Sequence, residues 1–208
     1  MAETDVDPAG GAGYRRSAGT PRGEARRREL LDRVTDDLAA NGLVDFSLRR
    51  AARAAGTTHK VLLYHFEGAA DLLQQAILLL RERRIGQGMG AAADGPAGRS
   101  LADQVRAMWP ILVGEQARVL EQAMGLAMYD PARHAELGRQ ASRQYLPALL
   151  SICPQHWSDR RKLEVAEMIL ATLRGFLVDA RTSADTDGIA AGFDALSRAL
   201  DREEAAVE

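Results

Sequence analysis

The amino-acid sequence predicts an all-α protein, with an N-terminal three-helix domain followed by a larger helical domain. Three observations support this fold class. Apolar residues recur every three or four positions along most of the chain, the spacing that buries one face of an α-helix. No stretch alternates apolar and polar residues as a half-buried strand does, and β-branched residues are sparse. The 208 residues, 46% of them hydrophobic, are enough to bury a substantial core.

The N-terminal elements follow from spacing and capping residues. Residues 1–23 are rich in Gly, Pro and Ala, and we expect them to be disordered. Residues 24–41 are predicted to form a helix that ends at Asn41-Gly42. Ser47 can cap a second helix from Leu48, and Thr58 can cap a third that runs to about Tyr64. A long amphipathic helix is expected over residues 69–84.

A Gly- and Ala-rich segment, residues 85–100, is predicted to be a linker that closes an N-terminal domain of residues 24–86. A second domain is predicted over residues 100–208. Its helices are expected near 101–113, 115–129, 131–151, 158–182 and 187–204. Pro110 lies inside the first of them and could bend or split it.

Charge is unevenly distributed along the chain. The net charge is −2, yet residues 14–66 hold eleven Lys and Arg against six Asp and Glu. Such a basic segment indicates either a local anionic partner or a solvated face. The single cysteine, Cys153, excludes an intramolecular disulfide. The N-terminus lacks the pattern of a signal peptide and no apolar run is long enough to span a bilayer, so we expect a cytoplasmic protein with no membrane partner.

Residues 48–64 have the sequence form of a helix-turn-helix, with two short helices joined by a tight glycine turn. Alanines at 51, 52 and 55 let the helices cross closely. On the second helix Leu62 and Phe66 point one way, and the opposite side carries donors that suit phosphate oxygens and base edges. The alternative is ordinary surface polarity on a short helix.

The run from Arg26 to Leu73, RRRELLDRVTDDLAANGLVDFSLRRAARAAGTTHKVLLYHFEGAADLL, resembles the DNA-binding domain of the TetR family of bacterial transcriptional regulators. It shows the family's order of helix, Gly turn, Ser/Thr cap, Ala-rich helix, Ala-Gly turn and a recognition helix ending in Tyr-His-Phe. Leu63 and Ala69 depart from the Tyr and Lys that the family usually has there as phosphate contacts, and each loss would weaken binding. The residues expected to contact operator DNA are Arg27, Arg28, Ser47, Arg49, Thr57, Thr58, His59, Lys60, Leu63, Tyr64 and His65.

The resemblance implies a divergent C-terminal ligand domain. Met and aromatic residues are concentrated between residues 108 and 168, and such residues either fill cores or line adaptable pockets. As a group they predict a cavity for an apolar or amphipathic small molecule. The expected lining residues are Trp109, Met124, Met128 and Tyr145. No cofactor is expected, and no metal site either, because His134 and Glu136 do not share a helix face.

The last two predicted helices carry long apolar stripes, and Gly175 allows close approach. The segment from Leu173 to Ser183, with these two helices, also resembles the TetR dimerisation pair. Two helices from each subunit would form a four-helix bundle across a two-fold axis. The expected interface residues are Leu173, Phe176, Phe193, Leu196 and Leu200.

These observations predict a dimeric transcriptional repressor that binds operator DNA through its helix-turn-helix and is released by an unknown small molecule. The alternative is a helical protein-interaction module that has lost DNA binding, a hypothesis motivated by Leu63 and Ala69. An enzyme is not expected, because the sequence shows no nucleophile–base pairing, no metal-ligand spacing and no Gly-rich phosphate loop.

Overall fold

The computed structural model describes residues 20–94, 98–114 and 117–206. Within these ranges the chain forms nine α-helices and no strand, which confirms the all-α prediction. The chain separates into two compact units, Met1–Leu80 and Arg81–Glu208, a boundary earlier than the predicted residue 86. The tail expected to be disordered falls, over residues 1–19, outside the described residues. Among the described residues no helix is both long and apolar enough to cross a bilayer.

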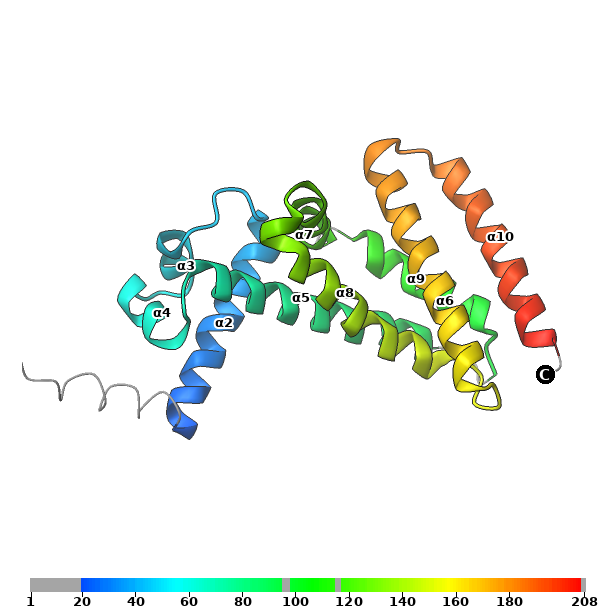
Figure 1. Ribbon diagram of the computed structural model, residues 1–208, viewed down its shortest axis with the longest axis horizontal. Coiled ribbons are helices and arrows are strands. Elements are labelled where there is room, and N and C mark those ends of the chain that lie inside the picture. The colour runs from blue at the N-terminus through cyan, green and yellow to red at the C-terminus, as the bar shows by residue number, and fades with distance from the viewer. Residues whose placement is uncertain (1–19, 95–97, 115–116, 207–208) are drawn as a thin grey trace, which may run out of the picture. The chain divides into compact units, whose positions relative to one another are not determined.

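The first unit contains α2 (Pro21–Asn41), α3 (Leu48–Ala54), α4 (His59–His65) and the first part of α5 (Ala69–Ala93) (Figure 1). Hydroxyl side chains begin the first three helices. Thr20, Ser47 and Thr58 each accept a hydrogen bond from the backbone N–H three residues later. Thr20 followed by proline starts α2 before the predicted residue 24.

The turn between α3 and α4 depends on Gly56. Its φ is 62°, in the left-handed region that a side chain disfavours. The small buried residues Ala51 and Ala55 let α3 pack closely against its neighbours α2 and α4. Leu62 is fully buried and Phe66 is 3% exposed, so α4 is held by its inner face and leaves the other face outward.

The long helix α5 contradicts the predicted linker. It continues past Arg84 to Ala93, so the glycine-rich stretch that was expected to be a loop is helical over residues 85–93. Glycine disfavours a helix by about 1 kcal/mol relative to alanine, but packing can outweigh this preference. Gly88 is buried, and a Cβ atom there would lie 3.8 Å from the Met108 side chain. The helix therefore belongs to both units.

The second unit adds α6 (Leu101–Val113), α7 (Ala117–Tyr129), α8 (Pro131–Ile152), α9 (Asp159–Thr182) and α10 (Thr186–Ala205). Within it α7 packs on α8, α8 on α9, and α6 against α9 and α10, which also contact each other (Figure 1). The predicted helices are found within a residue or two of their expected ends. Pro110 stays inside α6 without splitting it.

The apolar stripes of α9 and α10, where the subunit interface was expected, pack inside the unit in the single chain. Leu173, Phe193, Leu196 and Leu200 are buried core residues, and the ring of Phe176 lies 4.9 Å from that of Phe193. These stripes cover α6 and each other. The opposite face of α9 is exposed and carries the small or apolar residues Met168, Ala171, Gly175 and Val178.

Candidate nucleic-acid interface and ligand cavity

The outer face of α4 has the composition that the sequence predicts. His59 and Lys60 are exposed, Leu63 is 47% exposed, and Tyr64 is partly exposed. Thr57 is also partly exposed in the preceding turn. This face therefore presents a cation, an imidazole and an aromatic edge around one apolar residue, while the buried face holds the helix on the unit.

Helix α3 adds arginines to this surface. Arg49 and Arg53 are spaced i, i+4, so they share one exposed face of the helix. Arg28 on α2 and Lys60 on α4 are exposed as well. Within the described part of the chain, none of these four cations has an ion pair with a carboxylate. Arg53 is absent from the predicted set, although its spacing from Arg49 could have indicated it.

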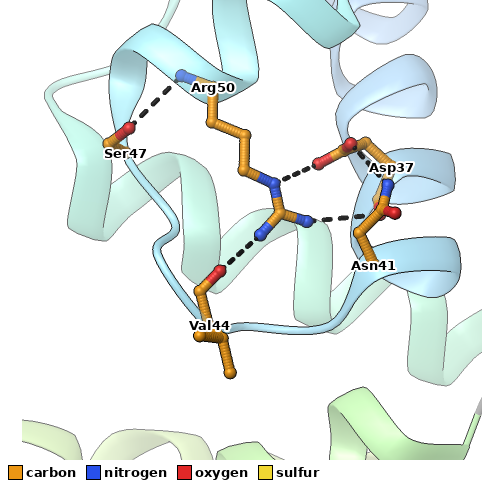
Figure 2. A network of polar contacts seen from close by, with 5 residues as sticks. All are labelled: Asp37, Asn41, Val44, Ser47 and Arg50. Carbon is orange, nitrogen blue, oxygen red and sulfur yellow. Dashed lines mark hydrogen bonds and ion pairs between the residues drawn. The ribbon is translucent and has the colours of Figure 1, made fainter.

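The other arginine of α3, Arg50, fixes the helix in place. Figure 2 shows its guanidinium between the end of α2 and the loop that leads into α3. Its Nε donates to Asp37 at 2.7 Å, and its terminal nitrogens donate to the Val44 carbonyl at 2.7 Å and the Asp37 carbonyl at 3.4 Å. The Asn41 amide donates to the same carboxylate at 2.9 Å. This network holds the α2–α3 loop and so orients Arg49 and Arg53.

Two residues predicted to contact DNA, Arg27 and His65, are engaged or partly buried within the first unit. Arg27 donates to the backbone carbonyl of His65 at 3.2 Å and to the Gln75 side chain, and its guanidinium lies 4.9 Å from the centre of the Phe66 ring. It therefore ties α2 to the end of α4 and to α5. The Nδ1 atom of His65 is buried without a hydrogen-bond partner among the described residues.

Burial lowers the pKa of His65 below its ordinary value, and the positive charges of Arg27 and Arg26 lower it further. This shift favours the neutral imidazole over a cation. The Ser47 and Thr58 hydroxyls have a second use, because an oxygen that accepts the capping hydrogen bond still has its own hydrogen to donate. Both residues are exposed.

The second unit contains a cavity of about 160 Å³. Side chains from α5, α6, α7, α8 and α9 line it, and most of them are apolar. Met124 and Tyr145, two of the four residues predicted for a ligand cavity, are in its wall. The Met and aromatic residues concentrated in the sequence therefore include part of this wall.

Trp109 and Met128 lie elsewhere, which corrects the predicted lining. The Trp109 ring packs in the core at 5.0 Å from the Phe193 ring, because it is on another side of α6 from the cavity residue Met108. Met128 shares a helical stripe with Met124 but is 77% exposed in the last turn of α7. Periodicity defines the direction of a side chain, but not where the neighbouring helices end.

Four charged residues in the cavity wall were absent from the predicted set, namely Arg81, Arg84, Glu121 and Arg174. Arg81 and Arg84 are 3% and 5% exposed, which is rare for arginine. The available sequence signal was their i, i+3 spacing on the apolar side of α5, beside Ile77, Leu80 and Ile85. The described residues include no cluster of three His, Cys, Asp or Glu side chains that could hold a metal ion.

No protein-family model and no curated protein sequence matches the chain, but solved structures match most of it. A TetR-family transcriptional regulator from Cytophaga hutchinsonii aligns with a TM-score of 0.64 and 14% identity, over 88% of this chain and 96% of that one. The multidrug binding protein EbrR, complexed with proflavin, aligns with a TM-score of 0.61 and 18% identity, over 83% and 98% of the two chains.

The fatty acid degradation regulator FadR from Bacillus halodurans aligns with a TM-score of 0.56 and 13% identity, over 84% of this chain and 94% of that chain. At such low identities these matches establish a shared fold. The chain therefore has the fold of the TetR-family regulators, which confirms the resemblance seen in its N-terminal sequence at the level of fold.

Proposed function

We propose that the protein is a homodimeric, cytoplasmic transcriptional repressor that binds operator DNA through α3 and α4 and releases it when a small molecule enters the cavity. The observation that carries this proposal is a set of exposed cations on α2, α3 and α4 that have no ion pair with a carboxylate within the described residues. Arg28, Arg49, Arg53 and Lys60 have the chemistry to contact phosphates, and the outer face of α4 has the size and polarity to enter a major groove.

Helix α5 supplies the route from ligand to DNA in this proposal. Its first residues pack in the DNA-binding unit, where Leu72 and Ile77 are buried, and its later residues Arg81, Arg84 and Ile85 line the cavity. A ligand that contacts this helix differently in two conformations shifts the balance between them. The DNA-competent conformation would be the one favoured by the empty cavity.

We further propose that the outer face of α9, residues Met168, Ala171, Gly175 and Val178, forms the subunit interface. Small residues allow close helix approach, and Val178 is 46% exposed in the single chain. Two copies related by a two-fold axis would bury this face isologously. The dimer would present two copies of α4 to half-sites separated by about 34–36 Å or a multiple of that.

A gel-shift titration against the DNA that flanks the protein's own gene tests the proposal. Lys60→Ala should weaken binding by about 1–3 kcal/mol per contact and lower the magnitude of the salt slope by about 0.9 per subunit. Arg118→Ala, which removes an equally exposed charge from α7, is the matched control and should leave both quantities unchanged. Equal effects of the two variants would contradict a DNA contact at Lys60.

One observation favours the second candidate, a protein-interaction module without DNA binding. Leu63 is 47% exposed at the centre of the α4 outer face, where an apolar side chain suits a protein partner better than a phosphate. Under this alternative the wild-type protein shows no salt-dependent DNA binding at all, and the same titration distinguishes the two functions.

A further inference from the structure

Arg84 is a buried charge in the wall of the cavity. It is 5% exposed, and its Nε and Nη2 atoms have no hydrogen-bond partner among the described residues. Burial lowers the pKa of Arg84 below its ordinary value, yet a guanidinium stays protonated in a protein. A buried cation whose donors are unused is strongly unfavourable unless an anion completes its surroundings.

The neighbouring arginines of the cavity wall, Arg81 and Arg174, also have only neutral hydrogen-bond acceptors among the described residues. Arg81 donates to the Gln144 side chain at 2.8 Å and to the Leu137 carbonyl at 3.4 Å. Arg174 donates to the Ser142 hydroxyl at 3.2 Å. All of these acceptors are neutral, and no carboxylate pairs with Arg81, Arg84 or Arg174 within the described ranges. Three guanidinium groups therefore line one cavity without a compensating acid bonded to them.

Glu121 is the acidic residue among those lining the cavity, and its carboxylate already forms an ion pair with Arg181. Its Oε2 accepts a hydrogen bond from the Arg181 side chain at 2.9 Å, whereas its Oε1 is buried and has no partner among the described residues. One carboxylate shared with Arg181 cannot neutralise three further cations. The wall therefore keeps an excess of positive charge, which favours an anion over a cation as the occupant.

The rest of the cavity wall is apolar and favours a ligand whose main part is apolar. Leu112, Leu120, Met124, Leu149 and Leu177 are among the lining residues. The volume of about 160 Å³ resembles engineered cavities, on the order of 150 Å³, that accept benzene. A ligand of this size buries its apolar atoms against Leu and Met while a single polar group reaches the arginines.

We infer that the cavity binds a small amphipathic carboxylate, whose anionic group is held by the forked donors of Arg84, with Arg81 and Arg174 adding positive potential, and whose apolar body lies among the Leu and Met side chains. A carboxylate accepts two parallel hydrogen bonds from one guanidinium, which would use the free Nε and Nη2 of Arg84. The role of this anion as the effector rests on the function proposed above, whereas its binding does not.

Calorimetric titration of the full-length protein without DNA, at about pH 7.5, tests the binding. The three probes share one chain and differ in the charge of the head group: octanoate, octan-1-ol and octylammonium. Octanoate should bind at least about tenfold more tightly than octanol, and octylammonium should bind most weakly. Equal affinities for octanoate and octanol, or no binding of any probe, would overturn the inference.

Variants at Arg84 distinguish a specific contact from general affinity. Arg84→Met keeps the length of the side chain and removes the buried charge, so it should fold and should bring octanoate affinity down to that of octanol. Arg84→Lys keeps a charge without the fork and should give an intermediate loss. Arg118→Met, an exposed position on α7, is the control and should match wild type. An octanoate preference that survives in both Arg84 variants refutes the role of Arg84.

Glu121→Gln tests the opposite charge preference. It removes the acid from the wall, so octanoate should bind at least as tightly as in the wild type. If octylammonium is the tightest ligand of the wild type and loses affinity in Glu121→Gln, the cavity is a cation site and the inference is wrong.

Addition of octanoate to the gel-shift titration separates the two proposals. Octanoate binding that depends on Arg84, without any operator binding, would contradict the proposed function and leave the ligand inference standing. Operator binding that depends on Lys60, without octanoate binding, would overturn the ligand inference alone.

Discussion

Replacing Arg50 with Ala tests the clamp that orients α3. The side chains of Arg50 and Asp37 are 14% and 18% exposed, so their ion pair is largely shielded from water. The change removes this pair and the hydrogen bonds to the Val44 and Asp37 carbonyls. Hydrogen bonds to charged groups contribute about 1.5–3 kcal/mol each, but residual exposure and the remaining Asn41–Asp37 bond reduce the loss. We expect the free energy of unfolding of the first unit to fall by about 2–3 kcal/mol.

Tryptophan fluorescence is unsuitable for this measurement, because Trp109 and Trp157 both lie in the second unit. Hydrogen–deuterium exchange of residues 42–58 reports on the first unit directly. A loss of 2–3 kcal/mol corresponds to about 30- to 150-fold faster exchange of amides that open through unfolding of that unit. The fluorescence-detected denaturation of the second unit should stay at its wild-type midpoint.

Arg53→Ala is the matched control, since Arg53 is on the same helix, exposed and without an ion pair within the described residues. Its effect on exchange should be within about 0.5 kcal/mol. Arg50→Met combined with Asp37→Leu should recover most of the stability, because the buried carboxylate no longer lacks a cation. If Arg50→Ala and Arg53→Ala exchange at the same rate, the network in Figure 2 does not stabilise the unit and the reasoning fails.

Four further outcomes follow from single positions. Gly56→Ala should destabilise the first unit by about 1–2 kcal/mol in the same exchange experiment, because its φ of 62° is strained for alanine. Gly90→Ala should stabilise the protein by about 0.5–1 kcal/mol, because Gly90 lies in a helix with open space around it. A loss of stability in Gly90→Ala would argue against a continuous α5. Val178→Glu should convert the dimer to a monomer in a sedimentation experiment. The control Val44→Glu, also at an exposed valine, should remain dimeric. A Val178→Glu protein that stays dimeric would place the interface elsewhere. The pKa of His65 is lowered in the folded state, so the unfolded chain binds the proton first and stability should fall as the pH drops below about 6.5. His65→Gln should flatten this decline in a pH series of denaturation curves. An unchanged pH profile in the variant would exclude His65 as the cause of the decline.

Local rules determined most of the helical framework from the sequence alone. The spacing of Leu62 and Phe66 predicted which face of α4 is buried, and Ser47 and Thr58 predicted where two helices begin. These predictions succeed because helical periodicity and capping depend on residues within a few positions of one another. The same rule explains why the predicted end of α5 was wrong. The glycines of α5 looked locally like a linker, and the packing of Gly88 against Met108 is invisible at that range.

Only the tertiary structure decided which partner each apolar or charged face meets. Periodicity showed that Leu173, Phe193 and Leu200 lie on apolar faces, and only the structure shows that these faces pack inside the unit. The i, i+3 spacing of Arg81 and Arg84 on the apolar side of α5 was available in the sequence, but it could not show that α7, α8 and α9 enclose Arg84 in a cavity. The physical reason is the same in each case. A side chain's direction is set by its own helix, whereas its burial, its hydrogen-bond partners and its pKa are set by segments distant in the sequence, whose positions no local pattern contains.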